Sequence, residues 1–261
     1  MQDLRNTWAL ITGASSGFGR DFAHLLAERG ANLVLVARRT EPMHMLATQL
    51  EKTHGIKVRV IGQDLSAANA ANDLKSLLDA ENIHITTLIN NAGFGLFGDF
   101  FDQDYARTEE MLRLNMMSLT QMTHVFGAPM KQAGKGNILL IASIGAYQAT
   151  PTYAAYSASK AYVLLFGEAL NSELAPFGVK LSVLSPGITA TSFLEVSGQK
   201  PTLYQRLVMM QSRPVAEIGL KAMFAGKASV VPGLINKLTI FSNRFAPRSL
   251  QTKLAYLLMK N

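Results

Sequence analysis

Two side chains four residues apart, Tyr156 and Lys160, are the part of this sequence best suited to proton chemistry. If a helix begins at Pro151 and Thr152, the two side chains are neighbours on one face of it. A nearby ammonium favours a phenolate over a phenol. Because a free phenol titrates near about 10, this charge would help Tyr156 to act as an acid or base near neutral pH. Such a pair also occurs by chance on solvated helix faces, so other features of the chain must support it.

The rest of the chain alternates short apolar segments with helical ones, which is a pattern that can position such a pair. Buried strands are predicted at 7–12, 32–37, 57–61, 85–90, 137–141 and 179–184, and helices at about 20–30, 41–54, 67–80 and 105–131. The alternation predicts a doubly wound parallel sheet with right-handed crossovers, a three-layer α/β/α Rossmann fold. We expect one domain over 1–261, with a substrate lid within 189–226 and a helical tail at 232–261.

A glycine-rich turn follows the first predicted strand. Gly13, Gly17 and Gly19 precede a helix, and such a turn presents backbone N–H groups and a helix N-terminus to an anion. Glycines also allow the close approach of a pyrophosphate. The turn therefore predicts a dinucleotide site, with a purely structural turn as the alternative.

The end of the second predicted strand indicates which dinucleotide binds. A site that prefers NAD usually has a carboxylate here for the ribose hydroxyls, whereas a 2′-phosphate attracts cations. This sequence has Ala37, followed by Arg38 and Arg39, and guanidinium groups bind phosphate bidentately. We therefore predict a preference for NADP(H) over NAD(H), with a solvated charge pair as the alternative.

Further motifs occur in order at the predicted strand ends: Asn-Asn-Ala-Gly at 90–93, Asn115, Ser143 and Pro186-Gly187. Together with the turn at 12–19 and the Tyr156/Lys160 pair, they resemble the short-chain dehydrogenase/reductase family in its single-domain branch. The resemblance covers roughly residues 6–230. It implies an oxidoreductase that transfers a hydride between a nicotinamide and a carbonyl or alcohol group, and it implies a homodimer or homotetramer.

The resemblance also implies a role for each matching residue. Tyr156 would exchange a proton with the substrate oxygen, Lys160 would bind the nicotinamide ribose and lower the Tyr156 pKa, and Ser143 would hydrogen-bond the same oxygen. Asn115 would hold a water that links Lys160 to solvent. The implied cofactor-binding residues, in addition to Tyr156 and Lys160, are Gly13, Ser15, Ser16, Gly17, Phe18, Gly19, Arg38, Arg39, Asp64, Leu65, Asn91, Ala92, Gly93, Pro186, Gly187, Ile188 and Thr191.

Composition narrows the functional class. The chain has 261 residues, of which 48% are hydrophobic, enough to bury the core of one open α/β sheet. The absence of cysteine excludes disulfides and thiolate metal sites, and the five histidines show no metal-ligand spacing, so we expect no metal. Neither a secretory signal nor a long apolar run is found, which favours a cytoplasmic location. Glu109 and Glu110 are predicted to lie on a solvated helix face, and Tyr147 and Tyr153 to contact substrate or to pack.

The net charge of +7 originates in the last 44 residues, after Glu217. No acid follows Glu217, whereas seven bases do: Lys221, Lys227, Lys237, Arg244, Arg248, Lys253 and Lys260. Leu250, Leu254, Leu257 and Leu258 follow a helical spacing beside them. A basic amphipathic helix suits a membrane surface or an anionic acyl carrier. The alternatives are packing on the core and a dimer interface. We expect no nucleic-acid binding, because no recognisable module accompanies the charge.

The apolar residues after Pro186 favour an apolar or acyl-type ketone as substrate, with the segment from Thr189 to Arg213 as a mobile lid. The alternative is that this apolar face packs on the sheet or on another subunit. A non-catalytic dinucleotide-binding regulatory or membrane-associated scaffold protein is the alternative function. The intact catalytic set argues against it, because a protein that only binds the dinucleotide has no need of Tyr156.

Overall fold

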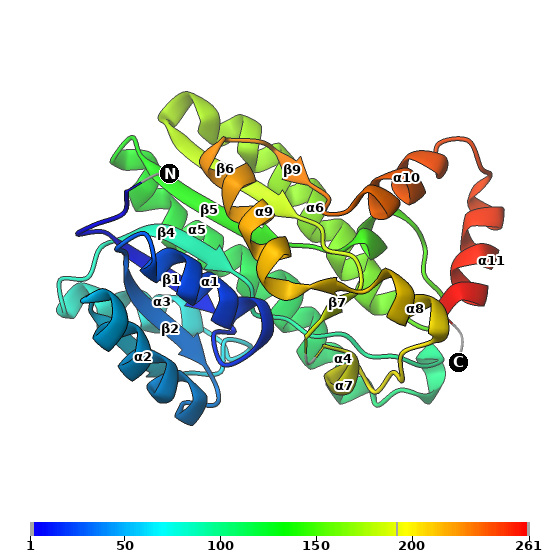
Figure 1. The fold of residues 1–261 in the computed structure, drawn as a ribbon, viewed down its shortest axis with the longest axis horizontal. Helices are drawn as coiled ribbons and strands as arrows, with labels where there is room; N and C mark the ends of the chain where they lie inside the picture. Colours follow the sequence, from blue (N-terminus) through cyan, green and yellow to red (C-terminus); the bar gives the residue numbers. More distant parts are fainter. Residues whose placement is uncertain (1–2, 192, 260–261) are drawn as a thin grey trace.

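The computed structural model, which describes residues 3–191 and 193–259, confirms the doubly wound fold (Figure 1). Parallel strands form one sheet in the order β3-β2-β1-β4-β5-β6-β9. Their bounds are β1 (Trp8–Thr12), β2 (Asn32–Ala37), β3 (Val58–Gly62), β4 (Ile85–Asn90), β5 (Gly136–Ile141), β6 (Val179–Leu184) and β9 (Ser229–Val230). The winding direction reverses between β1 and β4, and open sheets bind ligands beyond the strand ends at such a point.

Helices cover both faces of the sheet. The first layer contains α1 (Gly17–Ala27), α2 (Glu41–His54) and α9 (Ser212–Phe224), and the second contains α3 (Ala70–Ala80), α5 (Leu119–Gln132) and α6 (Ala154–Leu174). Successive strand residues point to opposite faces, so Ile11 and Leu35 pack on the first layer and Leu10 and Val36 on the second. Both faces of the sheet are therefore buried, which explains why its strands are continuous apolar runs.

The predicted helix at 105–131 is in fact three segments. These are α4 (Tyr105–Leu112), a π-helical segment η2 (Arg113–Ser118) and α5. Hydrophobic periodicity does not reveal a π segment, because the residues on either side of it keep a helical pattern. Such segments are frequent at functional sites, and this one contains Asn115.

Two helix starts differ from the prediction. The Tyr156/Lys160 helix α6 begins at Ala154 rather than at Pro151, because Thr152 has a left-handed backbone with φ of 68°. In the same way, α3 begins at Ala70 rather than at residue 67, after Asn69 with φ of 63°. Tyr156 and Lys160 both remain inside α6.

The C-terminal third adds segments outside the main sheet. They are β7 (Thr189–Ala190), α7 (Phe193–Ser197), α8 (Leu203–Val208) and β8 (Met210–Gln211), followed after α9 by α10 (Leu234–Ser242) and α11 (Arg248–Met259). The expected lid range 189–226 includes α9, whose buried Val215 and Leu220 pack in the core. The part of that range over the site is therefore 189–211. Figure 1 shows α10 and α11 projecting at the end of the molecule opposite α2.

No helix within residues 3–191 and 193–259 is both long enough and apolar enough to span a bilayer.

Candidate active site

The end of β5 and the first turns of α6 bring three of the predicted catalytic residues together. Tyr156 and Lys160 lie one turn apart, with Lys160 Nζ 5.7 Å from the centroid of the Tyr156 ring. Ser143 comes two residues after β5, and its side chain is near enough to the Tyr156 hydroxyl to lower the pKa of that phenol. The Ser143 hydroxyl also accepts the Gly145 N–H at 3.1 Å, which fixes its position. Two hydroxyl groups thus meet where a substrate oxygen could bind.

Asn115 completes the predicted group from the π segment. Its side chain is fully buried; Nδ2 donates to the Phe94 carbonyl at 2.9 Å and to Ser159 Oγ at 3.1 Å, and Oδ1 accepts the Phe94 N–H at 3.2 Å. A Cβ on Gly93 would lie 2.7 Å from Asn115 Oδ1 and 3.5 Å from Lys160 Nζ. Asn115 therefore fixes the backbone after β4 against α6, right beside Lys160.

Burial has the largest effect on the pKa of both Tyr156 and Lys160. It raises the pKa of Tyr156, and the nearby Ser143 side chain only partly offsets this effect. Burial also lowers the pKa of Lys160 to about 8, while its Nζ donates to the Ile141 carbonyl at 2.9 Å. The pKa of Tyr156 thus moves in the direction opposite to the one expected from the Lys160 charge, because desolvation of the phenolate is the larger effect. The phenol stays protonated at neutral pH.

The glycine turn after β1 is closed too tightly to accept side chains. Gly13 has φ of 66°, and a Cβ on Gly19 would lie 2.3 Å from the Gly13 carbonyl oxygen. The Thr12 hydroxyl accepts the N–H groups of Asn91 and Ala92, both at 2.8 Å, which joins the turns after β1 and β4. The first turn of α1 contains no acidic residue. These features fit the pyrophosphate of a dinucleotide.

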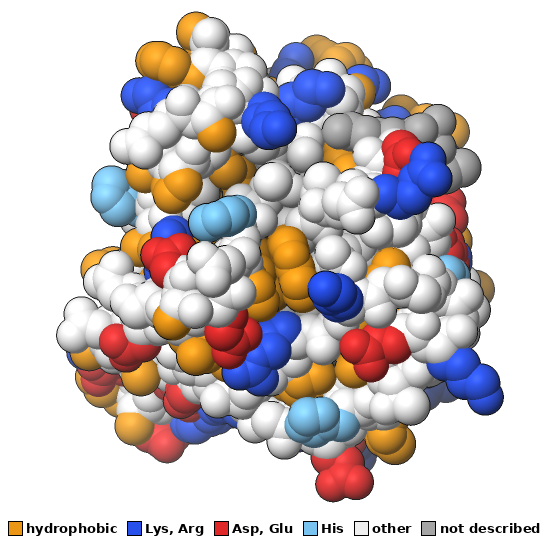
Figure 2. All heavy atoms as spheres, turned by 90° about the vertical axis from the view of Figure 1, so that its left-hand side faces the viewer, with side chains coloured by type: hydrophobic (Ala, Val, Ile, Leu, Met, Phe, Trp, Pro, Cys, Tyr) orange, Lys and Arg blue, Asp and Glu red, His pale blue; other side chains and the backbone are white. Residues whose placement is uncertain are grey.

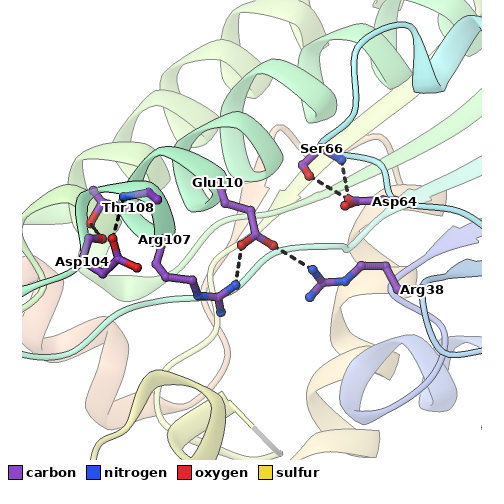
Figure 3. A network of polar contacts seen from close by, with 8 residues as sticks. Arg38, Asp64, Ser66, Asp104, Arg107, Thr108 and Glu110 are labelled. Atoms are coloured by element: carbon purple, nitrogen blue, oxygen red, sulfur yellow. Dashed lines mark hydrogen bonds and ion pairs between the residues drawn. The ribbon is translucent and has the colours of Figure 1, made fainter.

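A carboxylate that was predicted to be solvated lies at the other end of the cofactor region. Glu110 of α4 accepts a hydrogen bond from Arg38 Nη1 at 2.7 Å, and its other oxygen binds Arg107 (Figure 3). Its side chain is only 22% exposed. The prediction that Glu110 lies on a solvated helix face was therefore wrong. The pairing joins residues 72 positions apart, so no local sequence signal could reveal it.

Arg39 and Asp64, two further residues predicted to bind the cofactor, lie beside the same region. Arg39 Nη2 donates to Ser15 Oγ at 3.5 Å. Asp64 follows β3 and accepts hydrogen bonds from the Ser66 N–H at 2.9 Å and hydroxyl at 2.7 Å. Partial burial acts to raise the pKa of Asp64, but these bonds and the Arg38 charge lower it overall. Asp64 is therefore ionised and held in place.

One cavity of about 750 Å³ connects these groups. Gly19 and Asn115 lie behind its wall as buried supports, and the other predicted site residues line it: Gly13, Ser15, Ser16, Gly17, Phe18, Arg38, Arg39, Asp64, Leu65, Asn91, Ala92, Gly93, Ser143, Tyr156, Lys160, Pro186, Gly187, Ile188 and Thr191. The predicted site residues thus surround one continuous space.

Beyond Tyr156 the wall of the cavity is aromatic and aliphatic. The ring centroids of Phe193 and Tyr156 are 5.2 Å apart, and those of Tyr153 and Tyr156 are 5.6 Å apart. A Cβ on Gly95 would lie 2.7 Å from Phe193, so a side chain there would displace this ring. The apolar lining continues with Leu194, Val196, Val208, Ile240, Leu258 and Met259.

Tyr153, predicted either to contact substrate or to pack, lines the cavity and is also buried. Its hydroxyl bonds Ser197 Oγ and donates to Gln199 Oε1, each at 3.0 Å, and burial raises the pKa of Tyr153 to about 12. Nothing in the local sequence pattern indicated this link between α6 and the lid.

Within the described part of the chain, no three acidic or histidine side chains are grouped as metal ligands.

Comparison with known proteins identifies the family. The family model for short chain dehydrogenases matches residues 7–202. Mouse 17-beta-hydroxysteroid dehydrogenase type 3 is 30% identical over 258 residues, which is 97% of this chain and 84% of that protein. The very-long-chain 3-oxoacyl-CoA reductase of Phaeosphaeria nodorum is 33% identical over 76% of this chain, but the match spans only 59% of that longer protein. A solved short-chain dehydrogenase from Sphingobium yanoikuyae, in complex with NADPH, has a TM-score of 0.82 and 29% identity over 92% of this chain and 93% of its own. The chain therefore belongs to the short-chain dehydrogenase/reductase family of oxidoreductases, which bind a nicotinamide cofactor and act on alcohol and carbonyl groups.

Proposed function

We propose that this enzyme uses NADP(H) to interconvert a bulky, apolar ketone and its alcohol. One observation carries the proposal: a continuous cavity has arginines at one end, an apolar wall at the other, and Tyr156 with Ser143 between them. The cofactor end suits a phosphorylated dinucleotide, and the substrate end suits a large apolar molecule.

The charges at the end of β2 support NADP(H). Ala37 offers no carboxylate to the ribose hydroxyls. Arg38 and Arg107 both pair with Glu110. Arg39 and Asp64 line the cavity near them, so three cations face two carboxylates and the local balance is positive. A 2′-phosphate could take the place of Glu110 on the Arg38 guanidinium, because both groups offer two oxygen acceptors to the planar guanidinium fork.

The side chains of the site supply the proton and stabilise the charge. NADPH, when bound, supplies the hydride. As negative charge develops on the carbonyl oxygen, Tyr156 and Ser143 can both donate hydrogen bonds to it. The raised pKa keeps the proton on Tyr156 Oη until the more basic alkoxide oxygen takes it. The nearby Lys160 ammonium then stabilises the phenolate that remains, and Asn115 holds the backbone beside Lys160 in place.

The apolar wall supports a large substrate. It is formed mainly by apolar side chains of α7, α8, α10 and α11, and its polar members are Glu195, Gln205, Asn236 and Thr239. Two relatives are named for a steroid and for a very-long-chain 3-oxoacyl-CoA, which are large molecules with extended apolar parts. We therefore place the substrate of this enzyme in the same broad chemical class.

A ketone panel tests the proposal. Steady-state kcat/KM would be measured with NADPH and with NADH, on steroid-sized ketones, a long-chain 3-oxoacyl thioester and small polar ketones. We expect NADPH to be preferred at least about tenfold, a difference of about 1.4 kcal/mol, and the large apolar ketones to be preferred over the small ones. Preference for NADH or for small polar ketones would contradict the proposal. Tight NADPH binding with no turnover on any ketone would instead support the non-catalytic alternative.

A further inference from the structure

Helix α10 has two faces with different surroundings. Its inner face carries Asn236, Thr239, Ile240 and Asn243, which recur at helical spacing. Asn236, Thr239 and Ile240 line the cavity. Asn243, just after the helix, donates to Gln148 Oε1 at 2.8 Å and so links the helix to the loop after β5. The inner face of α10 is thus part of the substrate end of the site.

Helix α11 is attached to the site in a similar way. Ala255 is buried, and Leu258 and Met259 line the cavity. Gln199 Nε2 donates to the Met259 carbonyl at 2.9 Å, and Gln199 Oε1 accepts the Tyr153 hydroxyl at 3.0 Å. These buried contacts connect α11 through the lid to the catalytic helix α6, so the orientation of α11 is fixed.

The outer faces of both helices carry large apolar side chains, which we call the tail patch: Leu234, Leu238, Phe241, Phe245, Leu250, Leu254 and Leu257. Steps of three and four residues separate the members within α10 and within α11, so they lie along one side of each helix, while Phe245 lies in the turn between the two helices. All are exposed, with Leu234 at 72%, Phe245 at 76% and Leu257 at 71%. Clusters of this kind mark interaction sites.

Within the segment that carries the tail patch, residues 234–259, all charged side chains are positive. Lys237, Arg244, Arg248 and Lys253 are exposed, and no carboxylate occurs after Glu217. On the face shown in Figure 2, by contrast, acidic and basic side chains are interspersed. Helices with exposed leucine and phenylalanine on one side and lysine and arginine beside them bind at the interface of anionic bilayers.

We propose that the tail patch docks the enzyme on an anionic lipid surface, and that apolar substrate passes from the lipid into the cavity between α10 and α11. The second part rests on the proposed function, because it requires a lipid-soluble substrate. Docking of a second copy on the same patch is disfavoured by charge. A two-fold interface places a patch against itself, so the exposed cations of both copies would meet with no acid in the tail to offset them.

Vesicle flotation of the full-length protein with bound NADPH tests the docking. The vesicles would contain phosphatidylcholine alone, or phosphatidylcholine mixed with phosphatidylserine. The variants are Arg244→Gln/Lys253→Gln for charge and Leu238→Ser/Phe245→Ser for apolar contact. The matched controls on α2 are Lys52→Gln and Met45→Ser; Met45 is 65% exposed. None of these six side chains lines the cavity.

We expect the wild type and both controls to float with anionic vesicles and to bind less at high salt. Removal of each cation lowers partitioning about fivefold, the ratio that corresponds to about 1 kcal/mol, so the charge variant loses about 25-fold. The apolar variant is expected to lose at least about tenfold, because each side chain buries apolar area in the lipid. Equal binding by the wild type and both variants, or no binding to anionic vesicles, would overturn the proposal.

Two further measurements distinguish lipid docking from dimerisation and from binding to an acyl carrier protein. Light scattering would detect a dimer that Leu238→Ser/Phe245→Ser disrupts, and binding to an acidic acyl carrier protein would be measured in parallel. Either result without vesicle binding would overturn lipid docking. Turnover of a water-soluble ketone without vesicles is expected to be equal in all variants. If no ketone is turned over, the proposed function fails, whereas flotation still reports on docking.

Discussion

The cofactor end and the substrate end of the cavity are built from different parts of the molecule. The cofactor end consists of backbone at the ends of β1, β2 and β4, with tight turns and buried polar contacts. The substrate end consists mainly of apolar side chains on α7, α8, α10 and α11, all outside the seven-stranded sheet. The sheet thus fixes the chemistry, while the segments that select the substrate can vary without disturbing it.

The largest effect is expected where the cofactor end is most tightly closed. In Gly19→Ala, the new Cβ would lie 2.3 Å from the Gly13 carbonyl oxygen and 2.8 Å from Ala14 Cα, both rigid backbone atoms. The turn must therefore open. We expect the NADPH Kd to rise at least about 100-fold and the free energy of unfolding to fall by about 1–3 kcal/mol.

The matched control is Gly127→Ala in α5, where the new Cβ would lie at an ordinary 3.4 Å from Ile138 Cδ1. Alanine favours a helix over glycine by up to about 1 kcal/mol, so this variant is expected to keep its NADPH affinity and its stability. Calorimetric titration and urea unfolding would measure both quantities. Unchanged NADPH binding in Gly19→Ala would show that the turn is not a phosphate site.

The next largest effect is expected to distinguish the affinity for NADPH from the affinity for NADH. Arg38→Gln removes the guanidinium assigned to the 2′-phosphate, and hydrogen bonds to charged groups contribute about 1.5–3 kcal/mol. We expect the NADPH Kd to rise about 10–100-fold and the NADH Kd to stay unchanged. Arg113→Gln is the control, because Arg113 also pairs with a glutamate, at 2.8 Å, but does not line the cavity. An equal loss of affinity for both cofactors would contradict the assignment.

The buried charge of Lys160 is expected to lower the free energy of unfolding. Burial lowers the pKa of Lys160 to about 8, whereas an unfolded lysine titrates near about 10.4. Below pH 8, Lys160 is protonated in both the folded and the unfolded protein, and the full cost of burying its charge lowers the free energy of unfolding. This cost declines as the pH rises from 8 towards 10.4. Lys160→Met is therefore expected to raise the free energy of unfolding at pH 7 by about 1–3 kcal/mol and to lose this gain near pH 10.

Chemical denaturation at a series of pH values would measure this difference, with the exposed Lys135→Met as the control. A gain that does not vary with pH would mean that packing, and not the charge of Lys160, is responsible. Lys160→Met is expected to lose activity while it gains stability, as is common for catalytic groups.

The smallest effect is expected at the substrate end. Phe193→Ala removes a ring beside Tyr156 and enlarges the cavity without changing the sheet. We expect kcat/KM to fall about tenfold for bulky apolar ketones, the effect of about 1–3 kcal/mol of lost apolar contact, and less for small ones. Phe101→Ala, at a 96% exposed position, is the control. An equal loss for all ketone sizes would mean that Phe193 positions Tyr156 instead.

Much of the sheet and the site could be predicted because both depend on patterns that are local in sequence. The bounds of β2, β4 and β6 agree with the predicted strands, since each is a largely apolar run whose end is marked by a small or polar residue: Ala37, Asn90 and Ser185. The carboxyl ends of parallel strands meet at one edge of the sheet. For this reason Gly13, Asn91 and Ser143 line the same cavity despite their distance in sequence.

The features that were missed depend on tertiary contacts. Glu110 was predicted to lie on a solvated helix face, and only the fold brings Arg38 to it. β9 has only two residues and therefore no apolar run to detect. The direction of the Tyr156 pKa shift depends on how deeply the phenol is buried. The spacing in sequence places the Lys160 charge near Tyr156, but it does not show how deeply the Tyr156 phenol is buried.

The central claim is that Tyr156 donates the proton that completes hydride transfer from NADPH. NADPH oxidation with a bulky apolar ketone would be compared in the wild type and Tyr156→Phe, with the NADPH Kd measured on both proteins. Phenylalanine keeps the ring that packs on Tyr153 and Phe193 and removes only the hydroxyl. We predict an unchanged Kd and a kcat lower by about 10²–10⁴, the contribution of a positioned general acid. A Tyr156→Phe enzyme that turns over the ketone at the wild-type rate would contradict the account.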